Sequence, residues 1–149
     1  MRMKKSESQS TSSLKKRTHS ILEGVPIGLP ALSLAYQLTE KASRLGFDWP
    51  DLKGVLKKLD EEMKEFREAL SMQNPKRIRE EIGDLLFVLV NIARFLQIHP
   101  EKALRKTIEK FTSRFYYIET SLRKEGKTFR ESNLLEMDRL WEEAKKKHK

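Results

Sequence analysis

Two pairs of carboxylates mark residues 60–91, which read DEEMKEFREALSMQNPKRIREEIGDLLFVLVN. Glu62 and Glu65 form the first pair, and Glu81 and Asp84 form the second. Residues three apart lie on one face of an α-helix, so two adjacent helices would gather four carboxylates. Like charges at this spacing repel each other, and a charge beside apolar residues is costly to bury. The spacing therefore predicts a site for a hard divalent cation, Mg²⁺ or Mn²⁺.

A solvated acidic helix face is the alternative interpretation of the first pair. Three lysines precede a glutamate by four residues, which is the spacing of intrahelical ion pairs. These pairs are Lys57–Glu61, Lys58–Glu62 and Lys64–Glu68. The second pair favours the metal site, because Asp84 directly precedes the apolar run LLFVLV at 85–90.

The charge distribution argues against a dedicated nucleic-acid-binding fold. The 149-residue chain has a net charge of +9. Residues 1–20 contribute +5 and residues 145–149 contribute +4, so that 21–144 carry 21 basic and 21 acidic residues. A neutral body lacks the concentrated basic face that such folds present. We expect at most weak contacts between nucleic acid and the basic tails.

Cysteine is absent from the chain, which excludes disulfides, thiolate metal sites and a cysteine nucleophile. This composition is compatible with a reducing cytoplasm, the location that we expect. No apolar run reaches the roughly 18 residues typical of a membrane span, so no membrane association is expected. The basic start lacks the apolar core of a secretory signal.

Hydrophobic periodicity predicts an all-α chain, because apolar residues recur at helical spacing and no stretch alternates with a period of two. The predicted helices cover residues 31–45, 52–70, 74–96, 100–124 and 133–147. Gly46 is placed to end the first helix, and Asn74 with Pro75 suits a helix start. Asp48 or Asp51, in the turn before the second helix, is expected to cap the start of that helix or to interact with its dipole.

Two apolar surfaces in this pattern need partners. The helix at 74–96 is apolar almost all round in its middle, which predicts burial at a bundle centre or a dimer interface. The helix at 100–124 has an expected inner face of Ala103, Leu104, Ile108, Phe111, Phe115 and Ile118. We therefore expect a homodimer.

The carboxylate pattern is Glu61-Glu62-x-x-Glu65, a spacer of fifteen residues, then Glu81-x-x-Asp84. It resembles the signature of MazG-type nucleoside triphosphate pyrophosphohydrolases. Other resembling segments are GLPAL (28–32), GFDWPD (46–51), EEIGDLLFVLVNIARFL (80–96), EKALRKTIEKFTSRF (101–115) and LWEEAK (140–145). The resemblance covers about residues 24–147 and is to the second, catalytic domain of long MazG proteins. It implies one domain at 24–147, and the composition of the remaining residues, rich in Ser, Thr and Lys, predicts a basic, disordered tail at 1–23.

Membership of this family would imply an all-α bundle of four to five helices that assembles as a homodimer. It would also imply Mg²⁺-dependent hydrolysis of NTPs or dNTPs to the monophosphate and pyrophosphate, a reaction that suits house-cleaning of the nucleotide pool. The implied metal ligands are Glu62, Glu65, Glu81 and Asp84, with Glu61 in a supporting or general-base role.

The resemblance also implies residues that bind the substrate. Lys110 and Arg114 match the KFxxR segment of the family and would hold phosphates during catalysis. Trp141 would stack on the base, and Lys145 would contact a phosphate. Asn91 lies seven residues after Asp84 and is expected to bind substrate or a ligand water; the alternative is a structural hydrogen bond.

Two other functions remain open at this stage. One is a dUTPase-like or phosphoribosyl-ATP pyrophosphohydrolase relative within the same all-α group. The other is a non-catalytic helical dimer that binds a metal or a nucleotide. Release of pyrophosphate from an NTP in the presence of Mg²⁺ would separate the enzymes from the binding module.

Overall fold

A computed structural model describes residues 20–147 of the chain. The predicted tail therefore lies outside the described residues, except for its last four. The five α-helices are α2 (Ala31–Arg44), α3 (Leu52–Ser71), α4 (Pro75–Phe95), α5 (Pro100–Lys124) and α6 (Leu134–Lys147). Two short 3₁₀ helices are η1 (Ile21–Gly24) and η2 (Phe129–Glu131). The described part contains no strand, so the all-α prediction is confirmed.

The helix boundaries follow from local sequence signals. The side chain of Asp51 accepts a hydrogen bond from the Gly54 N–H at the start of α3 (3.0 Å). Asn74 caps α4 by accepting from the Arg77 N–H (3.2 Å). Gly46 follows α2 with a φ of +91°, a left-handed conformation that glycine adopts without strain. These caps confirm the predicted start of α4 and the predicted end of α2.

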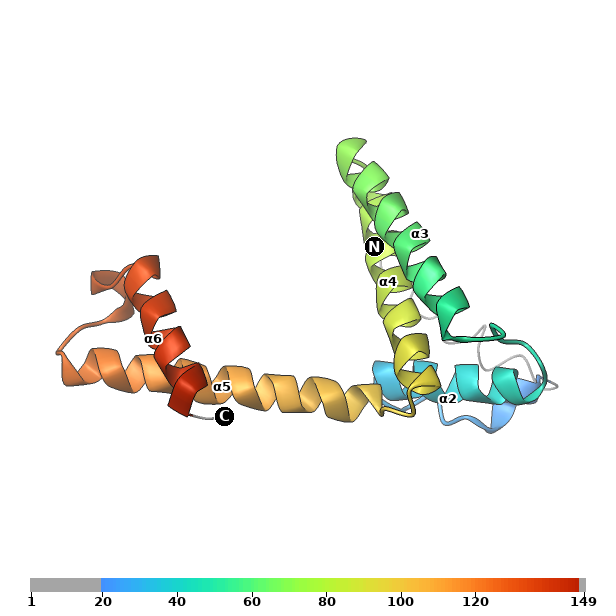
Figure 1. The fold of residues 1–149 in the computed structure, drawn as a ribbon, viewed down its shortest axis with the longest axis horizontal. Coiled ribbons are helices and arrows are strands. Elements are labelled where there is room, and N and C mark those ends of the chain that lie inside the picture. The colour runs from blue at the N-terminus through green and yellow to red at the C-terminus, as the bar shows by residue number, and fades with distance from the viewer. Residues whose placement is uncertain (1–19, 148–149) are drawn as a thin grey trace, which may run out of the picture. The chain divides into compact units, whose positions relative to one another are not determined.

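The chain divides into two compact units, one up to Glu101 and one from Lys102. In the first unit, α3 and α4 form a helical hairpin, and α2 packs against α4 (Figure 1). The apolar side chains buried on α3 and α4 are Val55, Ala69, Val88 and Val90. This hairpin positions the carboxylates of α3 against those of α4.

The second unit has a small core between α5 and α6. Ile118 and Leu122 of α5 pack with Leu140 of α6, and Tyr117, Met137 and Trp141 lie against them. This core covers only the C-terminal part of α5.

The prediction that this face of α5 is buried is therefore wrong over most of the length of the helix. Only Ile118 of that face is buried, whereas Leu104, Ile108, Phe111 and Phe115 are at least 39% exposed. The reason is length, because α6 has 14 residues and α5 has 25.

None of the helices in residues 20–147 is long and apolar enough by itself to cross a membrane. Only α4 and α5 taken together, as a bent pair, reach that length and composition.

An ion pair joins the turn before α3 to the end of α4. The two terminal guanidinium nitrogens of Arg94, Nη1 and Nη2, donate to the Asp48 carboxylate at 2.7 Å. Their side chains are 9% and 17% exposed, respectively. The hydrogen bond from Arg94 lowers the pKa of Asp48 from its ordinary value of 3.8. Asp48 is therefore the partner of Arg94, while Asp51 is the helix cap.

We expect Asp48→Asn to lower the free energy of unfolding by about 1 kcal/mol near neutral pH, because a charge-assisted hydrogen bond becomes a neutral one. Because the pKa of Asp48 is lower in the folded protein, its ionised carboxylate stabilises the fold above pH 3.8. This stabilisation is lost as the pH falls through the pKa that Asp48 has in the folded protein. The loss should therefore shrink in acid. Urea unfolding at several pH values, with the exposed Asp60→Asn as control, measures it; a pH-independent loss would contradict the assignment.

Candidate active site

Three carboxylates converge between α3 and α4. Glu62 comes from α3, and Glu81 and Asp84 come from α4. One oxygen atom of each lies within 4.8 Å of the other two. The hairpin thus brings together three of the four residues predicted to bind a metal ion.

Two of these carboxyl groups are buried with an unsatisfied oxygen. Glu62 is 5% exposed and Glu81 is 7% exposed. The Lys58 ammonium donates to Oε1 of Glu62 at 2.9 Å, but Oε2 of Glu62 and Oε2 of Glu81 are buried without a hydrogen-bond partner among the described residues. Buried carboxylate oxygens are normally paired. A hard cation would satisfy both, so the residues present fit Mg²⁺.

The electrostatics of the cluster also favour a cation. Burial raises the pKa of Glu81 above its ordinary value, and a hydrogen bond with Glu62 and the charges of Glu65, Glu62 and Asp84 raise it further. The nearest basic group to Glu81 in the described chain is the Arg77 guanidinium, at 3.9 Å. The hydrogen bond to Glu62 raises the pKa of Lys58. A divalent ion would remove the repulsion among these carboxylates.

Glu61 and Glu65 lie outside this three-carboxylate group. Both are exposed on α3. Glu61 lies 3.8 Å from the Lys58 ammonium, and the negative charge of Glu65 contributes to the raised pKa of Glu81. The predicted roles of Glu61 as a base and of Glu65 as a ligand remain predictions.

Asn91 lies on α4, two turns after Asp84, and is 1% exposed. Its amide nitrogen donates to the Phe87 carbonyl (3.1 Å), and its side-chain oxygen accepts from Arg94 (2.9 Å). Both polar atoms of the amide are therefore used within α4. A direct role in substrate binding remains a prediction.

The residues predicted to bind phosphate lie in the second unit. Lys110 and Arg114 line an open groove on α5 together with Lys106, Glu109 and Ser113. No carboxylate of the described chain lies within ion-pair distance of Lys110 or Arg114, and Nε of Arg114 is buried without a partner. Three basic side chains and the single carboxylate of Glu109 give the lining of this groove a net positive charge, which favours an anion.

The other predicted substrate residues lie on α6 and already have partners. The Arg114 guanidinium lies over the Trp141 ring, 5.4 Å from its centroid. Phe111 contacts the same ring at a centroid distance of 5.7 Å. Lys145 pairs with Glu142 at 3.4 Å. Base stacking by Trp141 would therefore compete with two existing contacts.

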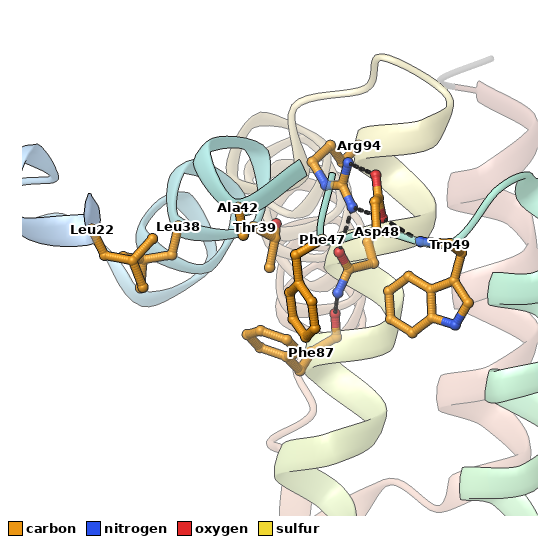
Figure 2. Close-up of a pocket in the computed structure, with 10 residues that line it drawn as sticks. Leu22, Leu38, Thr39, Ala42, Phe47, Asp48, Trp49, Phe87 and Arg94 are labelled. Carbon is orange, nitrogen blue, oxygen red and sulfur yellow. Dashed lines mark hydrogen bonds and ion pairs between the residues drawn. The ribbon is translucent and has the colours of Figure 1, made fainter. Parts of the chain in front are cut away.

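Sequence reasoning missed a pocket beside the carboxylate hairpin. The pocket is lined by residues of α2, α4, the turn at 46–49 and Leu22 of η1 (Figure 2). Asp48 and Arg94 form its polar end, although they are 46 positions apart in the chain. No spacing rule connects them, and the only signal was the aromatic-rich turn GFDWPD.

Comparison with known proteins identifies residues 51–117 as a match to the MazG nucleotide pyrophosphohydrolase domain. The chain is 45% identical over 131 residues to a nucleoside triphosphate pyrophosphohydrolase/pyrophosphatase MazG of Thermotoga maritima, a match that covers 88% of this chain and 50% of that protein. It is 38% identical over 135 residues to a nucleoside triphosphate pyrophosphohydrolase of Escherichia coli K12, covering 88% of this chain and 51% of that protein.

The chain spans about half the length of these curated relatives. The matched domain contains the three converging carboxylates together with Lys110 and Arg114, whereas Trp141 and Lys145 lie beyond it. The resemblance recognised from the carboxylate pattern is confirmed, because residues 51–117 match the MazG nucleotide pyrophosphohydrolase domain and these nucleoside triphosphate pyrophosphohydrolases are 38–45% identical to the chain over most of its length.

Proposed function

We propose that this protein hydrolyses nucleoside triphosphates to the monophosphate and pyrophosphate. The observation that carries the proposal is the group formed by Glu62, Glu81 and Asp84, two of whose buried oxygens find no hydrogen-bond partner within residues 20–147. The names of the relatives state a nucleoside triphosphate as the substrate. This supports a nucleoside triphosphate over the dUTPase-like and phosphoribosyl-ATP alternatives. The proposal differs from the non-catalytic alternative, in which a helical module only binds metal or nucleotide.

We assign Mg²⁺, with Mn²⁺ as a substitute, to Glu62, Glu81 and Asp84, and to Glu65 after rotation of its exposed side chain. When bound, the ion neutralises phosphate oxygens and lowers the cost of charge that develops on them. These carboxylates would hold the ion between α3 and α4. Lys58 holds Glu62 in place through its hydrogen bond.

In the proposed reaction, water attacks the α-phosphorus and the bond to the bridging oxygen breaks. We assign the general base to Glu61, which directly precedes the ligand Glu62 on α3 and would accept the proton of the attacking water. Lys110 and Arg114 hold the pyrophosphate that leaves, as a point charge and as a fork of donors. Lys145 is a further phosphate contact in this proposal, and Asn91 is assigned to the substrate or to a ligand water.

A screen for pyrophosphate release across canonical and damaged NTPs and dNTPs tests this proposal. Turnover of at least one of them with Mg²⁺ is expected. Preference for damaged nucleotides would support a house-cleaning role, and a cytoplasmic location is expected for it. Absence of turnover with every nucleotide would favour the non-catalytic alternative.

We also propose that the active form is a homodimer. Ile82, Leu86 and Leu89 of α4 are each 46–51% exposed, and together they form an apolar face. Faces of this kind on a small chain mark contacts between molecules, and a second copy can bury them symmetrically.

We therefore expect a dimer in sedimentation equilibrium at micromolar concentration and a monomer for Leu86→Glu, since a charge in the contact is costly to bury. Leu45→Glu, which places the same charge at another exposed leucine, should remain dimeric. A monomeric parent, or dissociation of both variants, would contradict the assignment of this face.

A further inference from the structure

An aromatic ring of α6 supports the guanidinium of Arg114 in the second unit. The Cζ atom of Arg114 lies 5.4 Å from the centroid of the Trp141 ring. Trp141 is half-buried, and the ring of Phe111 contacts it at a centroid distance of 5.7 Å and an angle of 54°. This arrangement lies beside the open groove that Lys110 and Arg114 line on α5.

Trp141 is itself held in place by its neighbours. It packs against the buried core between α5 and α6. Phe111, which contacts its ring, stacks on Phe115 at 6.0 Å, and Phe115 stacks on Phe129 of η2 at 5.2 Å. Aromatic pairs at such distances stabilise each other. The indole ring is therefore a fixed support, and the Arg114 guanidinium already covers part of it.

Two arginines of the chain are oriented in different ways. Arg94 is held by the carboxylate of Asp48 through two hydrogen bonds of 2.7 Å, so its charge is neutralised and two of its donors are used. Arg114 has no carboxylate within ion-pair distance in residues 20–147, and its buried Nε has no hydrogen-bond partner there. An aromatic face attracts a guanidinium without accepting conventional hydrogen bonds from it. Trp141 therefore orients Arg114 and leaves its charge and donors to a ligand.

We propose that Trp141 is a positioning residue for phosphate binding, which holds Arg114 instead of stacking on the base. The inference rests on the proposed function, in which Arg114 binds the pyrophosphate that leaves. A free arginine side chain loses rotamer freedom when it binds phosphate, whereas a stacked one has already lost much of it. Binding of the phosphates should therefore depend on the ring at position 141, whatever base the nucleotide carries.

Inorganic tripolyphosphate, which has phosphates but no base, separates the two roles of Trp141. We would measure it as an inhibitor of AMP formation from ATP at a fixed concentration of free Mg²⁺. Trp141→Leu should raise its inhibition constant and the KM for ATP by the same factor, about three- to ten-fold, because the cation–π contact is lost. A rise in the KM for ATP alone would show a base platform. That result, no change in either constant, or no inhibition of the parent would overturn the proposal.

The choice of nucleotide gives a second readout. If Trp141 acts on the phosphates, Trp141→Leu should lower kcat/KM by the same factor for every nucleoside triphosphate that the parent hydrolyses. Stacking strength depends on the base, so a base platform predicts losses that differ between purine and pyrimidine nucleotides. Losses that follow the size of the base would contradict the positioning role.

Trp141→Leu also removes a ring from the core, so further variants separate positioning from packing. Trp141→Tyr keeps an aromatic face and should recover most of the affinity for tripolyphosphate. In an Arg114→Ala background, Trp141→Leu should cause little further loss, because it acts through Arg114. Tyr117→Leu removes a ring that packs on the same core and carries Lys147 instead of Arg114, and it should leave the inhibition constant unchanged.

A purely structural role of Trp141 would give different results. Equal losses for Trp141→Leu in the two backgrounds, no recovery with Trp141→Tyr, or the same loss for Tyr117→Leu would overturn the inference. A parent that forms AMP while its inhibition by tripolyphosphate does not depend on Trp141 would overturn the inference alone. A parent that forms no AMP or other monophosphate from any nucleotide would overturn the proposed function, and the inference with it.

Discussion

Asp84→Asn and Glu81→Gln are each expected to lower kcat/KM for pyrophosphate release by at least about 100-fold. Loss of a residue that only supports a metal ligand costs about 10–100-fold, and loss of a ligand itself should cost more. Both substitutions keep the size of the side chain, so the helical circular dichroism spectrum should not change. Glu68→Gln, an exposed substitution on α3, should retain parental activity. Full activity of Asp84→Asn and Glu81→Gln would contradict the metal assignment.

The same variants should separate metal binding from folding. A cation that binds only the folded state raises the melting temperature, so Mg²⁺ should stabilise the parent more than either variant. Without metal, Glu81→Gln should melt above the parent, because a neutral amide removes a buried carboxyl group from the repulsion of Glu62, Glu65 and Asp84. Thermal unfolding with chelator and with Mg²⁺ measures both effects. A lower melting temperature for metal-free Glu81→Gln would contradict this description of the cluster.

Arg114→Ala is expected to lower kcat/KM by ten-fold or more. A charge-assisted contact to phosphate contributes about 1.5–3 kcal/mol, which corresponds to about 10- to 150-fold. The variant also removes the cation that lies over Trp141, so its fold should be checked by the near-ultraviolet spectrum. Lys102→Ala, on the same helix and exposed, should have little effect.

Salt distinguishes a specific phosphate contact from general attraction. If the basic residues of α5 only steer the substrate, Arg114→Ala and Lys102→Ala should be equally harmful, and moderate ionic strength should remove both losses. A specific contact should keep the difference between the two variants. Equal, salt-sensitive losses would show that Arg114 is an ordinary surface charge.

Local signals in the sequence account for most of the helical structure. Apolar periodicity predicted all five α-helices to within about one or two residues, and the caps at Asp51 and Asn74 explain why α3 and α4 begin where they do. The ends of α3 and α4 were predicted to within one residue, although the usual signal is missing there. Gln73 and Gln97 adopt positive φ values of 50° and 57° there, without the glycine that normally marks such an end.

The candidate site was predictable where it depends on helical spacing. Residues three apart on α3 and α4 were expected to face each other, and Glu62, Glu81 and Asp84 do converge. Contacts between distant segments were not predictable in this way. Asp48 and Arg94 meet because α2 packs on α4, and the pocket that both residues line depends on that packing.

Hydrolysis of ATP in H₂¹⁸O, followed by mass spectrometry of the products, tests the central claim most directly. Attack of water on the α-phosphorus predicts AMP that carries one ¹⁸O and pyrophosphate that carries none. The products should appear only with a divalent cation, and Asp84→Asn should form almost none of them. Formation of ADP and phosphate, label in the pyrophosphate, or equal turnover by Asp84→Asn would contradict a carboxylate-bound metal site that cleaves at the α-phosphorus.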